Sequence, residues 1–65
     1  MTIQYDKETD TLYVILSNDT IVESEEKTKD VIVDYNANDE VVAIEVLHVK
    51  ENEHTIELPL ILKSA

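Results

Sequence analysis

Glycine and cysteine are both absent from the 65 residues of this chain. Without glycine, neither the P-loop nor the dinucleotide-binding fingerprint, which both cradle phosphate groups, can form. Without cysteine, a disulfide framework and a thiolate zinc site are excluded. The chain must therefore make its tight turns with other residues that tolerate a positive φ, chiefly Asn and Asp.

Basic residues are also scarce. Five lysines and no arginine stand against fifteen acidic residues, which gives a net charge of −10. This charge repels phosphate groups, so we expect binding neither to nucleic acid nor to anionic membranes. It favours a basic protein as partner, although an acidic surface that only keeps the protein soluble has the same composition.

Long apolar segments are missing as well. The longest apolar run, Leu58 to Leu62, is about a quarter of the length that spans a bilayer. Met1 to Asp10 contains no signal-peptide core, so we expect a cytoplasmic location. A chain of 65 residues forms one domain, residues 1–65, with one modest core. Cores of this size are often completed by a second subunit, and we expect a homodimer.

Tyr5 and Tyr35 each begin the same pattern, which is the main structural signal in the chain. An apolar residue lies two positions before each tyrosine, a polar loop follows it, and apolar residues stand seven, nine and eleven positions after it. This alternation predicts two β-hairpins with matching apolar faces. With only two copies, we interpret them as two hairpins of one sheet rather than as an internal repeat.

The second hairpin has a predicted register. Asn38-Asp39 offers two residues that tolerate the positive φ values of a type I′ turn. A turn centred there gives these pairs on the apolar face: Tyr35 with Val42, Val33 with Ile44, and Val31 with Val46. On the second face the pairs are Asp34 with Ala43, Ile32 with Glu45, and Asp30 with Leu47. In the first hairpin, with a wider loop after Asp6, the pairs are Tyr5 with Leu12, Ile3 with Val14, and Met1 with Leu16.

The rest of the chain has weaker patterns. Ile21 and Val22 start a third stretch, and residues 23–30 are too charged for a buried strand, so they form either an edge strand or a short helix. Residues 48–54 form a loop or a single helical turn. Residues 55–63 show strand periodicity, which Pro59 limits to an edge strand or converts into a final helical turn.

Together these patterns predict a mainly β fold that borders on α+β. We expect a small antiparallel sheet of four to five strands in meander order, with or without one short C-terminal helix. Its apolar face comprises Met1, Ile3, Tyr5, Leu12, Val14, Leu16, Val31, Val33, Tyr35, Val42, Ile44 and Val46. Either the tail of the chain or a second copy must cover this face.

No set of residues has the spacing of a catalytic or cofactor site. Asp6, Glu8 and Asp10 alternate like the first ligands of a calcium loop, but the glycine and the closing glutamate of such a loop are missing, which favours a solvated hairpin loop. His48 and His54 are six residues apart, whereas two ligands on one helix face need a spacing of three or four. We therefore predict no catalytic residues, no cofactor and no metal ligands. The alternative is a small metal-binding protein or enzyme that uses His48, His54 and nearby carboxylates.

The second face of the predicted sheet is half apolar and half acidic. An apolar patch with charged residues around it is typical of a protein-binding surface, and ordinary exposed surface is the alternative. The candidate partner-binding residues on this face are Tyr13, Ile15, Ile32, Asp34, Glu45 and Leu47.

Two segments also carry a family resemblance. Residues 5–14 (YDKETDTLYV), and Val31 to Tyr35 followed by a polar turn and Val42 to Leu47, resemble the two signatures of a small prokaryotic family called domain of unknown function 2283. The resemblance covers residues 3–48 and implies a compact, mainly antiparallel β domain. It implies no site residues, because the function of the family is not established, and it links some relatives to toxin–antitoxin-like gene pairs. The chain departs from the family pattern at Asn38-Asp39, where the family commonly has Asp-Gly, and at Ala43, where it has glycine.

These observations favour a non-enzymatic protein-interaction module, and an antitoxin-like partner of a basic protein is one form of that hypothesis. Its competitors are the metal-binding protein or enzyme described above and a structural homodimer that acts as a subunit of something larger.

Overall fold

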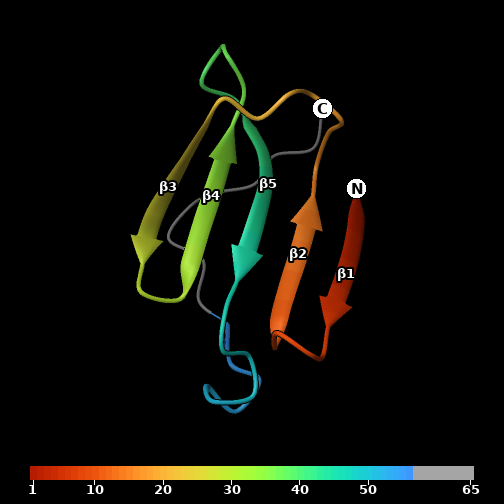
Figure 1. The fold of residues 1–65 in the computed structure, drawn as a ribbon, viewed down its shortest axis with the longest axis vertical. Coiled ribbons are helices and arrows are strands. Elements are labelled where there is room, and N and C mark those ends of the chain that lie inside the picture. The colour runs from red at the N-terminus through yellow and green to blue at the C-terminus, as the bar shows by residue number, and fades with distance from the viewer. Residues whose placement is uncertain (57–65) are drawn as a thin grey trace.

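Five β-strands form one antiparallel sheet in the computed structural model, which describes residues 1–56 (Figure 1). The strands are β1 (Thr2–Asp6), β2 (Thr11–Ile15), β3 (Glu23–Thr28), β4 (Val31–Tyr35) and β5 (Val41–Val46). Their order across the sheet is β1-β2-β5-β4-β3, and every neighbouring pair is antiparallel. The mainly β fold and the antiparallel pairing are therefore confirmed.

The predicted meander order is wrong, because β5 lies between β2 and β4. β5 (VVAIEV) is strongly apolar and four of its six residues are buried, whereas β3 (ESEEKT) is exposed throughout. Burial thus favours the central position for β5, and charge favours an edge for β3. The connection from β2 to β3, residues 16–22, crosses one end of the sheet and produces this Greek-key order (Figure 1).

The third stretch forms an edge strand and not the alternative helix. β3 begins at Glu23 instead of Ile21, and β4 is its one neighbour among the five described strands. Glu23 pairs with Tyr35 and Glu25 with Val33, so glutamates continue two apolar rows out to the edge of the sheet. Charged side chains at an edge discourage pairing with stray strands.

The second hairpin has the predicted register from Val31 to Asp34 and departs from it at the turn. A β-bulge shifts the register so that Tyr35 pairs with Val41 and not with Val42. The loop has three residues, 37–39, and the Asn36 N–H donates to the carbonyl of Glu40 at 3.0 Å to close it. In this loop only Asp39 has a positive φ, 60°. A type I′ turn needs two such residues, so the predicted turn type is wrong.

The first hairpin has the predicted pairs of Ile3 with Val14 and Tyr5 with Leu12, and the predicted wider loop. Its four loop residues, 7–10, are organised by Asp6, whose Oδ1 accepts the Glu8 N–H at 2.9 Å. β1 begins at Thr2, so the expected pair of Met1 with Leu16 is not part of the sheet.

The core lies on the predicted apolar face, over β2, β5 and β4. Ile44 and Val33 are cross-strand neighbours and are both fully buried. Val14, Val31 and Val46 complete the sheet's contribution to the cluster. Val49, which follows β5, packs into the same cluster and shows that the segment after the sheet helps to build the core.

The rest of the predicted apolar face is only partly buried. Ile3 and Tyr5 lie in the expected rows but are 64% and 44% exposed, and Met1 is 78% exposed. The reason is their position at the edge strand β1, which among residues 1–56 has a neighbouring strand on one side only. Val42 is buried but is not in the core cluster, since the bulge gives its expected place to Val41.

A series of turns follows β5 over residues 49–54. The Asn52 N–H donates to the His48 carbonyl at 3.1 Å, and the His54 N–H donates to the Val49 carbonyl at 3.0 Å. No helix is found in residues 1–56. The predicted C-terminal helical turn and the apolar row of Leu58, Leu60 and Leu62 lie outside the described residues.

Candidate partner-binding site

A hollow of about 370 Å³ lies on the face of the sheet opposite the core. Side chains of β2, β4 and β5 form its floor, and the crossover connection between β2 and β3 contributes to its wall. We call it the second-face hollow; its lining residues are Tyr13, Ile15, Ser17, Asn18, Asp19, Ile21, Asp34, Val42, Ala43 and Glu45.

The strand register explains how these residues meet. Tyr13 pairs with Glu45 across β2 and β5, and one row further along Ile15 pairs with Ala43. Ala43 in turn pairs with Asp34 on β4, so the carboxylates of Asp34 and Glu45 are diagonal neighbours on adjacent strands. The two carboxylates therefore come together because of pairings that apolar burial on the opposite face determines.

Asp34 is the buried acid of the hollow, with only 4% of its surface exposed. The Ser24 hydroxyl, on the edge strand β3, donates a hydrogen bond to Asp34 Oδ1 at 2.6 Å. A buried carboxylate needs such donors, because desolvation without hydrogen bonds is costly. Ser24 is the residue of β3 that pairs with Asp34, and its small hydroxyl side chain stands between Glu23 and Glu25 in the sequence.

Glu45 is half-buried beside Asp34, and its pKa is raised above the usual value of a glutamate. Burial is the main cause, followed by the hydrogen bond and the negative charge of Asp34. All three effects disfavour the ionised carboxylate of Glu45. Within residues 1–56, no lysine forms an ion pair with Asp19, Asp34 or Glu45. The hollow therefore combines apolar walls with negative charge that no lysine within residues 1–56 neutralises by an ion pair.

Asn36 holds the rim of the hollow in place. Its Nδ2 donates to Asp19 Oδ2 on the crossover connection and to Glu40 Oε1 after the turn, both at 3.0 Å. Its Oδ1 accepts the main-chain N–H groups of Asn38 at 2.9 Å and Glu40 at 3.0 Å. One buried amide thus joins the β4–β5 turn to the connection that walls the hollow.

Four of the six residues predicted for partner binding line this hollow together: Tyr13, Ile15, Asp34 and Glu45. Ile32 lies on the same face, next to Glu45 in its row, but is not a lining residue. Leu47 lies just beyond the end of β5, donates its main-chain N–H to the Asp30 carbonyl at 2.8 Å, and is not a lining residue of the hollow either. Sequence reasoning missed Val42 and the crossover residues, since only the bulge and the strand order bring them here.

His48 and His54, the two histidines of the alternative hypothesis, do not belong to a cluster of metal-ligating side chains. In residues 1–56 no group of three or more metal-ligating side chains is placed to hold a metal ion. His48 Nδ1 instead lies 2.9 Å from Asp30 Oδ1, and Asn52 Nδ2 donates to Asp30 Oδ2 at 3.1 Å.

Of the acids suggestive of a calcium loop, Asp6 organises the hairpin turn. Asp10 accepts the Tyr5 hydroxyl at 2.6 Å and the Lys50 N–H at 3.0 Å.

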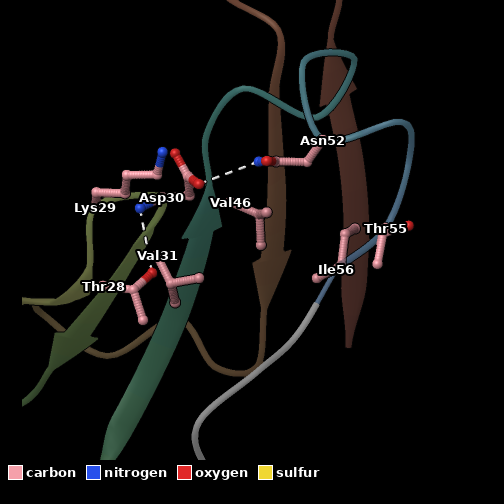
Figure 2. A pocket seen from close by; sticks show the side chains of 8 residues that line it. All are labelled: Thr28, Lys29, Asp30, Val31, Val46, Asn52, Thr55 and Ile56. Carbon is pink, nitrogen blue, oxygen red and sulfur yellow. Dashed lines mark hydrogen bonds between the residues drawn. The ribbon is translucent and has the colours of Figure 1, made fainter.

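A second hollow, of about 450 Å³, lies beside the β3–β4 turn (Figure 2). Figure 2 shows the Asp30 carboxylate at its upper margin, pointing toward Asn52, while Val31, Val46 and Ile56 provide apolar surface. The one carboxylate here is already engaged by Asn52 and His48. This hollow is therefore part of the contact that holds residues 48–56 to the sheet, and it is a weaker candidate for recognition.

The contact between His48 and Asp30 predicts a pH dependence of stability. The Asp30 hydrogen bond raises the pKa of His48, and the same bond is the main reason that the pKa of Asp30 is lowered. A histidine whose pKa is raised on folding stabilises the fold below its unfolded pKa of about 6.5, and this contribution disappears as pH rises through the raised value. The Asp30 contribution has the opposite sign, because it is present above the unfolded pKa and lost as pH falls through the lowered value.

We therefore expect the wild-type protein to lose stability as pH rises from about 6.5 through the raised pKa of His48, and His48→Gln to lose much less. Melting temperatures at fixed ionic strength measure the difference. Asp30→Asn removes the carboxylate partner of His48 and is expected to reduce the change in melting temperature over the same pH range. An unchanged pH profile in both variants would contradict the pairing.

The part of the chain that the structure describes contains no helix capable of crossing a membrane. No curated protein and no solved structure has a significant match to the chain. Residues 2–50, which include all five strands, match the family described as "Protein of unknown function (DUF2283)". The match covers well over half of the sequence and confirms the resemblance carried by the two hairpins, and so this chain belongs to the DUF2283 family.

Proposed function

We propose that this protein is a non-enzymatic interaction module that binds a basic segment of a partner protein in the second-face hollow. The observation that carries the proposal is the pair of neighbouring carboxylates, Asp34 and Glu45, beside the apolar side chains of Tyr13, Ile15 and Val42. An antitoxin-like association with a basic partner is one biological form of this activity.

The chemistry of the hollow fits a lysine or arginine side chain. Such a side chain has an apolar stem and a charged end, so it lies favourably along apolar surface when its end reaches a carboxylate. In the hollow, Tyr13 and Ile15 offer the apolar surface, and Glu45 lies next to Tyr13 in the same row. Burial and, after it, the proximity of Asp34 raise the Glu45 pKa, and a cation there would relieve the unfavourable proximity of the two carboxylates.

The net charge supports the same partner chemistry. With a net charge of −10, the protein attracts basic partners over a distance and repels acidic ones. The hollow adds a place where one or two cationic side chains lose their solvent and fit among defined neighbours. Charge alone would give weak binding that spreads over the whole surface, whereas the hollow predicts a localised contact.

Glu45→Gln tests the proposal because it is expected to move binding and stability in opposite directions. Burial beside Asp34 disfavours the ionised Glu45, so removing its charge is expected to leave the fold as stable as wild type or more so at pH 7. The same change is expected to weaken binding of a basic peptide by about tenfold, since a charge-assisted hydrogen bond is lost. Affinity of the wild type should also fall as pH is lowered through the raised pKa of Glu45.

The probe is a synthetic peptide of alternating lysine and leucine, compared with a peptide in which norleucine replaces each lysine. Amide chemical shifts are expected to move at Tyr13, Ala43 and Glu45 with the first peptide and not with the second. Glu8→Gln, on the exposed β1–β2 loop, removes an equal charge and should bind like wild type. Equal binding by the Glu45→Gln and Glu8→Gln variants, or shifts confined to β3, would overturn the assignment of this hollow.

A further inference from the structure

We propose that the exposed edge of β1 pairs with β1 of a second copy of this chain, around a two-fold axis at Ile3, to form one continuous antiparallel sheet. The inference concerns an edge of the sheet and does not depend on the second-face hollow, whose lining comes from β2, β4, β5 and the crossover connection.

The two edges of the sheet differ sharply in charge. β3 carries Glu23, Glu25 and Glu26, and all of its residues are exposed. β1 has no charged side chain from Thr2 to Tyr5, and charge returns only at Asp6. Natural proteins place charges on an exposed edge strand to prevent pairing with other strands. That protection is present on β3 and missing from β1.

The main-chain groups of β1 are oriented for pairing. Leu16, just after β2, donates its main-chain N–H toward β5 at 2.8 Å. Because these groups alternate in direction along a strand, those of Tyr13 point toward β1, where Gln4 is its partner. The N–H and C=O groups of Ile3 and Tyr5 therefore point away from the sheet. Both residues also have exposed side chains.

Symmetry favours a second copy over another kind of partner. A two-fold axis at Ile3 places Ile3 opposite the same residue of the partner and Met1 opposite Tyr5, so that apolar side chains meet on the core face. Thr2 then lies opposite Gln4, and no carboxylate falls within the paired segment. A basic strand would find no acidic side chain between Thr2 and Tyr5 to pair with.

Electrostatics also favours this edge for self-association. Each copy carries a net charge of −10, so two copies repel one another wherever their acidic surfaces approach. β1 is separated from the acidic β3 by the full width of the sheet. Pairing through β1 therefore keeps the three exposed glutamates of each copy as far apart as the sheet allows.

Sedimentation equilibrium of the full chain tests the proposal. We expect a dimer at high micromolar concentration, and we expect its dissociation constant to fall as salt is raised from about 0.02 M to about 0.5 M, because screening reduces the repulsion between copies. Binding of a basic partner should respond to salt in the opposite way, so the two proposals can fail separately. A chain that stays monomeric at high micromolar concentration and high salt overturns the proposed dimer.

Two matched variants locate the interface. Ile3→Lys places like charges directly opposite each other and is expected to weaken the dimer by at least about tenfold, without loss of stability because Ile3 is 64% exposed. Val22→Lys also introduces a lysine at an exposed aliphatic residue, since Val22 is 60% exposed. Val22 directly precedes β3, on the opposite edge of the sheet from β1, so this variant should leave the dimer intact. A dimer that survives Ile3→Lys would overturn the proposed edge.

A single introduced thiol tests the register. The native chain has no cysteine, so Ile3→Cys is expected to form a disulfide-linked dimer under mild oxidation, whereas Val22→Cys is not. Across an antiparallel pair the two Cα atoms lie about 4.5–5.5 Å apart, within the range that a disulfide spans. Equal cross-linking by the two variants would contradict the two-fold axis at Ile3.

Discussion

Replacing Ile44 with alanine is expected to destabilise the protein by about 2–5 kcal/mol, which is the usual cost of removing a fully buried aliphatic side chain. Ile44 is fully buried in the central strand β5 and contacts the core beside Val33. Domains have roughly 0.05–0.15 kcal/mol of stability per residue, so this chain has about 3–10 kcal/mol in total. The substitution is therefore expected to unfold a large fraction of the molecules at 37 °C. Urea unfolding followed by circular dichroism measures the loss.

The matched control is Ile3→Ala, because Ile3 and Ile44 stand in the same cross-strand row on either side of Val14. Ile3 is 64% exposed, so the same chemical change is expected to cost less than about 0.5 kcal/mol when measured on dissociated chains at low concentration. Ile44→Val, at about 0.5–1.5 kcal/mol, keeps the comparison measurable if the alanine variant does not fold. Similar losses at Ile3 and Ile44 would show that the row does not run from an exposed edge to a buried centre.

Asn36→Ala is expected to cost about 2–3 kcal/mol, an unusually large effect for a polar residue in a turn. Its side chain is 7% exposed and makes four hydrogen bonds, two to side-chain carboxylates and two to main-chain N–H groups. Alanine would leave these groups without their partner in a partly buried region. Asn36→Asp is expected to cost more, because it removes the donor and places a third carboxylate beside Asp19 and Glu40.

Asn38→Ala is the control for the turn. Asn38 is an exposed residue of the same loop, and its part in the network is its main-chain N–H, which alanine retains. We expect Asn38→Ala to change the free energy of unfolding, measured with urea, by less than about 0.5 kcal/mol. If Asn36→Ala and Asn38→Ala behaved alike, the amide network would not be what joins the crossover connection to the turn.

The bulge at Val41 and Val42 links the fold to the proposed function. It moves Val41 beside Tyr35, in the row that an unbroken hairpin would give to Val42, and leaves Val42 to line the second-face hollow. Bulges often redirect side chains near functional sites. Here the redirected valine adds apolar surface to the hollow beside Ala43, its neighbour in the chain.

The candidate site was predictable from the sequence only where it depends on local pairing. The sequence predicts one common face for Asp34, Glu45, Tyr13 and Ile15, because a strand alternates its side chains between two faces. It does not predict that Ser24, Val42 and the crossover residues belong to the site. Ser24 reaches Asp34 from the edge strand β3, whose charged residues show no apolar alternation that would predict their register with β4. Val42 depends on a bulge that the turn residues do not indicate.

The sequence by itself determined the two hairpins, their registers from Val31 to Asp34 and from Ile3 to Tyr5, and the face on which the core lies. These features follow from the alternation of apolar and polar residues and from short turns, so each depends on residues that are close together in the sequence. Only the tertiary structure decided that β5 occupies the centre and that β1 remains an exposed edge. Strand order is a competition among all strands for burial, and its outcome depends on which pairs hide the most apolar surface across the whole sheet. No local pattern contains that comparison, and for this reason the hollow and the open edge emerge only once the chain has folded.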